Sequence, residues 1–181
     1  MITDFSAQPK PQNKKARNLM ILFFVLAAIA FAITTIVGQY RGIIGMLCVG
    51  FLTSGTLMYT KYLSVRFYYD IIATGVDEPL FVVRQMTGKR EVTLCRVTLA
   101  DIERVERETA AERKAHKKDK TTALFIYCPT LSPNVSYRMY VKSGFEKSEL
   151  ILEGSDEFFS KVVEFAAEAR ELRALNEEDD Y

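Results

Sequence analysis

The sequence has 181 residues and carries 24 Lys and Arg against 23 Asp and Glu, a formal net charge of +1 at pH 7. This balance argues against a strongly basic nucleic-acid-binding protein. The three cysteines, Cys48, Cys95 and Cys128, have neither zinc-site spacing nor the even count of a disulfide framework, so we expect reduced thiols in a cytosolic setting. An apolar N-terminal third precedes a highly charged remainder, which indicates two parts of different character.

Residues 1–18 contain prolines, amides and little apolar content. They also carry four basic side chains, Lys10, Lys14, Lys15 and Arg17. This composition predicts a flexible basic tail.

Two apolar runs without a charged side chain follow, 19–37 and 43–59. About 20 apolar residues, at about 1.5 Å each, cross a hydrocarbon core of about 30 Å, so we predict a transmembrane helical hairpin over 19–63. A buried hairpin in a soluble core is the alternative, but a chain this short needs a larger partner to hide both helices. A cleaved signal peptide is disfavoured, because the first run exceeds the usual roughly 7–15 apolar residues and a second run follows at once.

The basic residues predict the orientation of this hairpin. Four precede the first run, only Arg41 lies in the connection, and Lys61 and Arg66 follow the second run. Positive charge is retained on the cytoplasmic side of a membrane, so both termini are expected in the cytoplasm.

Small residues four apart suit close packing of the two helices: Ala28 and Ala32 in the first run, and Gly50 and Ser54 in the second. No Asp, Glu, Lys, Arg or His lies within either run. Ionisable side chains inside the membrane are the usual mark of a transport path, so we interpret the hairpin as an anchor rather than a channel.

From residue 65 the pattern changes to short segments rich in branched and aromatic residues, separated by turn residues. We expect a cytoplasmic domain over 64–175 with seven strands: 65–73, 80–87, 91–97, 102–107, 121–128, 135–142 and 147–153. The short loop 88–90 marks a hairpin between the second and third strands. Residues 108–120 lack an apolar stripe, and we expect a mobile loop or a short helical excursion there.

A C-terminal amphipathic helix is expected to begin after Ser155, a favourable N-cap. Apolar side chains recur at three-to-four spacing from Phe158 to Leu172, which predicts one face packed on the sheet. Helicity should fade near Leu175, where an acidic tail, 176–181, begins.

This order of strands, closed by one helix, resembles that of a pleckstrin-homology (PH) barrel. The stretch FVVRQMTGKREVTLCRVTLADIERVE, with its Leu99-Ala100-Asp101-Ile102 segment, is similar to bacterial PH-like domains. The piece YCPTLSPNVSYRMYV is similar to small bacterial proteins with two N-terminal membrane helices and a PH-like tail. The resemblance covers residues 65–172 and the anchor. It implies an α+β protein of the bacterial inner membrane with a seven-stranded antiparallel barrel or sandwich, and it carries over no catalytic residue.

Residues that commonly carry chemistry have no convergent partners in the sequence. His116, the only histidine, lies in a lysine-rich loop, and Asp101 has the place of a turn residue. Cys95 and Cys128 fall in expected strands, as small hydrophobic residues do. No phosphate-binding loop, dinucleotide-binding, zinc-protease or nucleophile-elbow motif is present. We therefore expect no enzyme, no metal and no cofactor.

The segment 112–120 is the most basic part of the expected domain. It carries Arg113, Lys114, Lys117, Lys118 and Lys120 against Glu112 and Asp119. Near an anionic leaflet each Lys or Arg contributes about 1 kcal/mol of attraction. A solvated loop, a lipid contact and a protein contact are all compatible with this pattern.

We expect a non-catalytic, membrane-anchored module that recruits or senses a protein or peptide partner, since sheets can bind an added strand at an exposed edge. One alternative is binding of anionic phospholipid by the segment 112–120, together with Lys89 and Arg90. Another is an accessory role in a larger membrane complex, through the small-residue faces of the helices. No nucleic-acid partner is expected, because Glu103, Glu106, Glu108 and the acidic tail balance the basic residues.

Overall fold

The computed structural model describes residues 5–9, 13–37, 40–72, 78–116 and 122–179, with side chains up to residue 176. Contacts divide the chain into two compact units. The helical unit is Gln12–Val65, and the β-rich unit combines Met1–Pro11 with Arg66–Tyr181.

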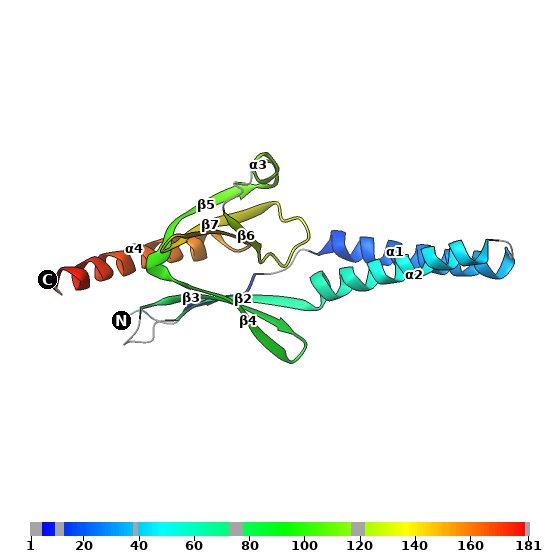
Figure 1. Cartoon of the computed structure of the whole chain (residues 1–181), viewed down its shortest axis with the longest axis horizontal. Coiled ribbons are helices and arrows are strands. Elements are labelled where there is room, and N and C mark those ends of the chain that lie inside the picture. Colours follow the sequence, from blue (N-terminus) through cyan, green and yellow to red (C-terminus); the bar gives the residue numbers. More distant parts are fainter. Residues whose placement is uncertain (1–4, 10–12, 38–39, 73–77, 117–121, 180–181) are drawn as a thin grey trace. The chain divides into compact units, whose positions relative to one another are not determined.

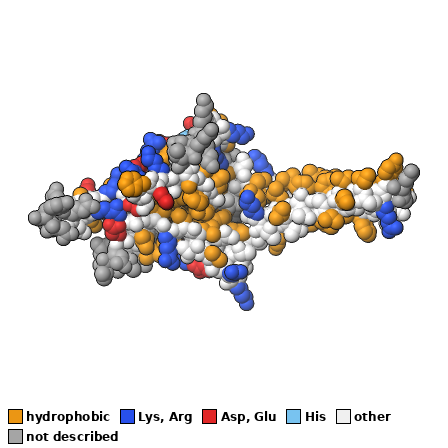
Figure 2. Space-filling model, viewed as in Figure 1, with side chains coloured by type: hydrophobic (Ala, Val, Ile, Leu, Met, Phe, Trp, Pro, Cys, Tyr) orange, Lys and Arg blue, Asp and Glu red, His pale blue; other side chains and the backbone are white. Residues whose placement is uncertain are grey.

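The helical unit is a pair of helices that run side by side (Figure 1). They are α1 (Lys14–Ile36) and α2 (Arg41–Met58), and α2 continues through the π-helical turn η1 (Tyr59–Leu63). Both are long and apolar enough to cross a membrane, with mean hydropathies of 2.8 for α1 and 1.6 for α2 with η1. A core helix of a soluble protein is mostly buried, whereas apolar side chains of these helices lie along the outside (Figure 2).

The two helices meet through small residues. Ala27 and Ala30 of α1 and Cys48 and Gly55 of α2 are buried. The Cys48 thiol donates a hydrogen bond to the Ala27 carbonyl oxygen at 3.4 Å. A Cβ at Gly55 would lie 3.2 Å from the ring of Phe24, so the glycine permits the close approach of the helices.

The predicted packing residues are therefore wrong in part. Ala28, Ala32 and Gly50 are exposed, and only Ser54 is partly buried. Successive residues of a helix are about 100° apart, so the residues chosen from the sequence lie on a face next to the one that meets the other helix.

The β-rich unit contains two four-stranded sheets. Sheet A has the strand order β1-β2-β3-β4. Its strands are β1 (Phe5–Ala7), β2 (Val65–Ile72), β3 (Leu80–Thr87) and β4 (Arg90–Thr98). Sheet B has the order β5-β7-β8-β6. Its strands are β5 (Ile102–Thr109), β7 (Val135–Ser143), β8 (Glu146–Leu152) and β6 (Ala123–Ile126).

Three helical segments complete this unit: the 3-10 turn η2 (Leu99–Asp101), α3 (Ala110–Ala115) and α4 (Asp156–Asp179). α3 begins with a capping box in which Thr109 and Glu112 satisfy each other's backbone N–H groups. The expected excursion within 108–120 is thus helical in its first part. α4 begins as predicted, since the Phe158 N–H donates to the Ser155 hydroxyl at 3.2 Å.

All seven predicted strands are present, but the barrel is not: the described residues form two separate sheets and no closed barrel. β1 lies within the segment expected to be a flexible tail and pairs antiparallel with β2, Ser6 opposite Asp70. A three-residue strand is too short to give a periodic signal.

β6 also differs from expectation, because it pairs parallel with β8. The chain after β6 stays alongside β8: the Tyr127 N–H donates to the Ile151 carbonyl at 2.9 Å, and the Cys128 thiol donates to the same oxygen at 3.5 Å. β6 is thereby held at the outer edge of sheet B, on the far side of β8 from β7.

The core lies where both sheets meet α4. The Phe158 ring lies 6.2 Å from that of Tyr69 in β2 and 5.6 Å from that of Phe5 in β1. Phe159 stacks on Tyr137 of β7, with ring centroids 3.9 Å apart. α4 therefore covers β1 and β2 of sheet A and β7 of sheet B, while β4 and β6 are the strands at the other ends of the two sheets.

A buried ionic cluster occupies the face of sheet B opposite Tyr137 and the core. Arg138 of β7 is 2% exposed and donates to Glu108 of β5 and Glu149 of β8, which are also buried. A second bond to Glu108, from the Arg138 Nη2, measures 3.1 Å. Removing one member of such a cluster leaves the others unpaired at low dielectric.

Replacing Arg138 with Ala should destabilise the β-rich unit by about 3–5 kcal/mol, because two buried carboxylates lose their shared partner. Near-ultraviolet circular dichroism of the tyrosines during denaturant titration of the detergent-solubilised chain measures this loss. The control is Arg104→Ala, which breaks an exposed ion pair with Glu106 and should cost at most about 1 kcal/mol. Equal losses in the two variants would contradict the prediction.

Candidate functional site

The basic side chains selected from the sequence are divided between different elements. Lys89 and Arg90 are exposed at the β3–β4 turn, where Gly88 has a φ of 61°. Arg113 lies in α3, and its Nη2 donates to the Pro133 carbonyl at 2.8 Å, so this charge serves the fold. Lys114 is exposed in α3, and Lys117, Lys118 and Lys120 lie outside the described residues.

The other singled-out side chains take part in structural contacts. The His116 Nε2 lies 3.8 Å from a carboxylate oxygen of Glu149 in the ionic cluster. Asp101 of η2 accepts a hydrogen bond from Arg173 of α4 at 2.8 Å, which ties the helix to the turn. Within the described ranges, no three His, Cys, Asp or Glu residues are grouped so as to hold a metal ion.

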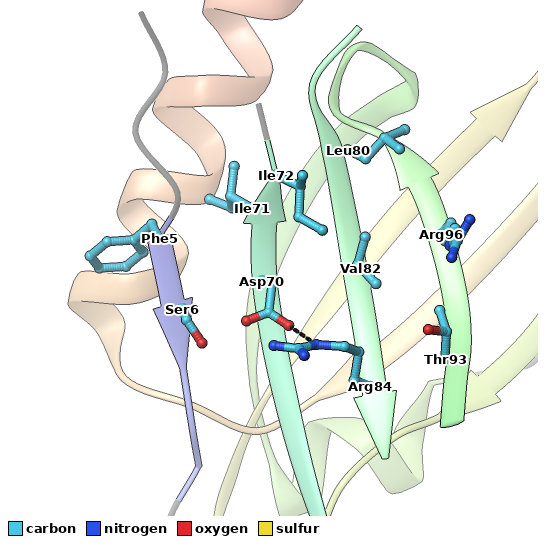
Figure 3. Close-up of a pocket in the computed structure, with 10 residues that line it drawn as sticks. All are labelled: Phe5, Ser6, Asp70, Ile71, Ile72, Leu80, Val82, Arg84, Thr93 and Arg96. Atoms are coloured by element: carbon cyan, nitrogen blue, oxygen red, sulfur yellow. Dashed lines mark hydrogen bonds and ion pairs between the residues drawn. The ribbon is translucent and has the colours of Figure 1, made fainter. Parts of the chain in front are cut away.

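An open pocket of about 590 Å³ lies on the outer face of sheet A, the face opposite Tyr69 and the core (Figure 3). Its apolar part is formed by Ile72, Leu80 and Val82. The strands around it also contribute charged and polar side chains, Asp70, Arg84, Thr93 and Arg96 among them.

The charges of this pocket are unevenly paired. Asp70 is buried, and its carboxylate accepts from the Arg84 Nε at 2.5 Å. Arg84 also donates to Glu91 at 2.6 Å, and these two hydrogen bonds raise the pKa of Arg84. Arg96 is exposed and forms no ion pair with another described residue. Arg84 serves two carboxylates, so these four side chains carry no net charge in total. The positive charge without an ion-pair partner among the described residues, that of Arg96, lies on β4.

Among the described strands, β4 is a free edge of sheet A, because β3 is its one neighbour in the sheet order. An edge strand presents unpaired N–H and C=O groups, which proteins commonly shield with Pro, Lys, short length or a bulge. β4 is nine residues long and contains neither Pro nor Lys. Its protection is a bulge at Leu94, between Thr93 and Cys95, which face Arg84 and Val83 of β3. The edge also exposes 43% of Val92 and 36% of Leu94.

β6 is one of the two end strands of sheet B in the described chain, with β5 at the other end. Phe125 pairs with the core residue Leu150, yet 43% of Phe125 is exposed, so it lies at the rim of the core. Its ring stacks on Tyr127 at 6.2 Å. The Tyr127 hydroxyl lies near the Cys95 thiol of β4, and this neighbour contributes to the raised pKa of Tyr127. Side chains thus connect the two edges, although their backbones do not pair. We call this region the open seam, defined by Val92, Leu94, Cys95, Phe125 and Tyr127.

The chemistry of the open seam suits binding. Burial raises the pKa of the Cys95 thiol and also that of the Tyr127 phenol, so both groups are neutral near pH 7. A neutral thiol is a poor nucleophile. An apolar rim beside a free strand edge is instead the arrangement to which an extended peptide adds.

Sequence reasoning anticipated strand addition in general but assigned none of the seam residues to a binding edge. The strands β4 and β6 were expected, but one sequence does not show which strands end a sheet. The available signal was the alternation of Val92 and Leu94 with polar residues in a short strand, which predicts a strand with one apolar face.

Alkylation of Cys95 should be slow at pH 7 and should accelerate as pH rises, because a raised pKa leaves little thiolate at neutral pH. Cys128, whose pKa burial raises to about 12, should react later still. Mass spectrometry of the folded chain treated with iodoacetamide measures both rates, with glutathione as the reference thiol. If Cys95 reacted at pH 7 as fast as glutathione, its pKa would not be raised.

No protein-family model matches this sequence, and no curated protein matches it. The geometry of the open seam and the two apolar helices is therefore the basis for assigning a function.

Proposed function

We propose that this chain is a membrane-anchored, non-catalytic module that captures an extended segment of a partner protein at the edge of β4. The observation that carries this proposal is the open seam, where a nine-residue free edge lies beside exposed apolar side chains. An added segment would satisfy the free backbone groups of β4 and cover Val92, Leu94 and Phe125.

The helical unit supports the anchoring part of the proposal. Both helices are long and apolar enough to cross a membrane. Lys14, Lys15 and Arg17 precede the first apolar run, Lys61 follows the second, and Arg41 alone lies near the connection. We propose two spans with both termini in the cytoplasm. The order of strands followed by α4 supports a relation to bacterial PH-like domains, and with it an inner-membrane location.

Val92→Lys and Leu94→Lys, made singly, should each weaken peptide capture by about tenfold or more, because a charge at the rim opposes desolvation of the edge. Peptides of ten residues, selected by phage display against the full chain in lipid nanodiscs, serve as ligands for affinity measurement. The control is Phe145→Lys, which adds the same charge at a fully exposed position of the β7–β8 turn, outside the open seam.

Hydrogen exchange of the same complexes locates the bound peptide. Amides of β4 should exchange more slowly when the selected peptide is present, because they become hydrogen-bonded to it. Protection confined to other strands, or unchanged affinity in both seam variants, would exclude capture at β4.

A second candidate function, contact with anionic phospholipid, is supported by the place of Lys89 and Arg90. Both are exposed at the β3–β4 turn. β3 runs opposite to β2 (Figure 3), so this turn lies at the end of sheet A where β2 begins. β2 follows η1 almost directly in the chain.

If these side chains contact lipid, trypsin should cleave after Lys89 and Arg90 more slowly in anionic nanodiscs than in neutral ones. High salt should remove the difference, because it screens exposed charges. Cleavage after Lys147, exposed in β8, provides the internal reference. Equal cleavage at Lys89 and Arg90 in both lipids would exclude the contact.

A further inference from the structure

We infer that the segment captured by β4 is an alternating strand, acidic on one face and apolar on the other. Its carboxylates would meet Arg96 on the outer face of sheet A, and its apolar side chains would close the open seam on the inner face. This inference rests on the proposed capture at β4 and names the chemistry of the captured partner.

The pairing of β4 with β3 assigns the two faces. Arg96 is opposite Val82 and Thr93 is opposite Arg84, on the side of the outer pocket. Cys95 is opposite Val83, a fully buried core residue. Side chains of a strand alternate between the faces of a sheet, so a segment added to β4 places every second side chain next to the outer face and the others next to the seam.

The inner face of the added segment meets an apolar rim. Val92 pairs with Gln85 on the same side as Cys95, and it is 43% exposed there. Phe125 of β6, also at the rim of the core, is 43% exposed. Apolar side chains of the captured segment would remove this surface from water, whereas charged ones would be desolvated without a partner.

The outer face of the added segment meets the exposed guanidinium of Arg96. Glu91, the one carboxylate on β4, is already bonded to Arg84. Arg96 is exposed and unpaired within the described chain, and in Figure 3 it lies on β4, two strands away from Asp70. Opposite charges on adjacent strands attract and like charges repel, so an acidic residue beside Arg96 is favoured and a basic one is excluded.

The test uses the full chain in neutral-lipid nanodiscs and three capped eight-residue peptides, in which Val alternates with Glu, Gln or Lys. The wild-type chain should bind the Val–Glu peptide about tenfold more tightly than the Val–Lys peptide. Arg96→Glu should reverse this order, because it changes the sign of the charge at the exposed edge. Arg104→Glu, on the exposed surface of β5, is the control and should leave the order unchanged.

The possible results separate the inference from the function on which it rests. Equal affinity of the three peptides for the wild-type chain, or an unchanged order in Arg96→Glu, would overturn the acidic preference while leaving strand capture intact. Failure of all three peptides and of the displayed peptide library would overturn the capture itself. Circular dichroism of Arg96→Glu confirms that the variant is folded.

Discussion

The packing of Phe158 and Phe159 is the contact on which the β-rich unit depends. These two side chains of α4 reach β1 and β2 of sheet A and β7 of sheet B, and so hold the sheets together along one side. One helix cannot also cover the opposite side, where β4 and β6 end their sheets. There the Cys95 and Tyr127 side chains of the two sheets approach each other, and no backbone pairing between β4 and β6 is present in the described part of the chain. The open seam is thus a consequence of closure on one side.

The sequence predicted well what depends on local pattern. Branched and aromatic residues located seven strands, and Ser155 located the start of α4. The predictions that failed concern the arrangement of the strands in space. β1 is too short to give a pattern, and the sequence does not show that β6 pairs parallel with β8. The helix contact was placed one face away, on Ala28 rather than Ala27. The edge site was missed for the same reason, since strand order is a long-range property.

The near-neutral composition conceals how the charges are used. Arg138 and Arg84 are each held between two carboxylates, and Arg173 of α4 joins Glu78 to Asp101. Each of these arginines is fully engaged in ion pairs within the fold. Two exposed cations without an ion pair to another described residue, Arg90 and Arg96, lie on β4, and others, such as Lys114 and Lys147, lie on other elements. A sequence of near-zero net charge therefore has exposed positive charges on the edge strand β4. Counting charges along the chain does not reveal this placement.

The bulge at Leu94 of β4 would limit self-association of a chain anchored in a membrane as proposed. Copies of the chain that diffuse in the plane of one membrane collide often. Two regular β4 edges would then pair with each other through their backbone groups. The bulge at Leu94 interrupts the regular spacing of backbone N–H and C=O groups on which such pairing depends. A short flexible segment can adapt to the bulged strand, whereas the edge of a second rigid sheet cannot. A high density of the protein in the membrane therefore does not lead to self-association through β4.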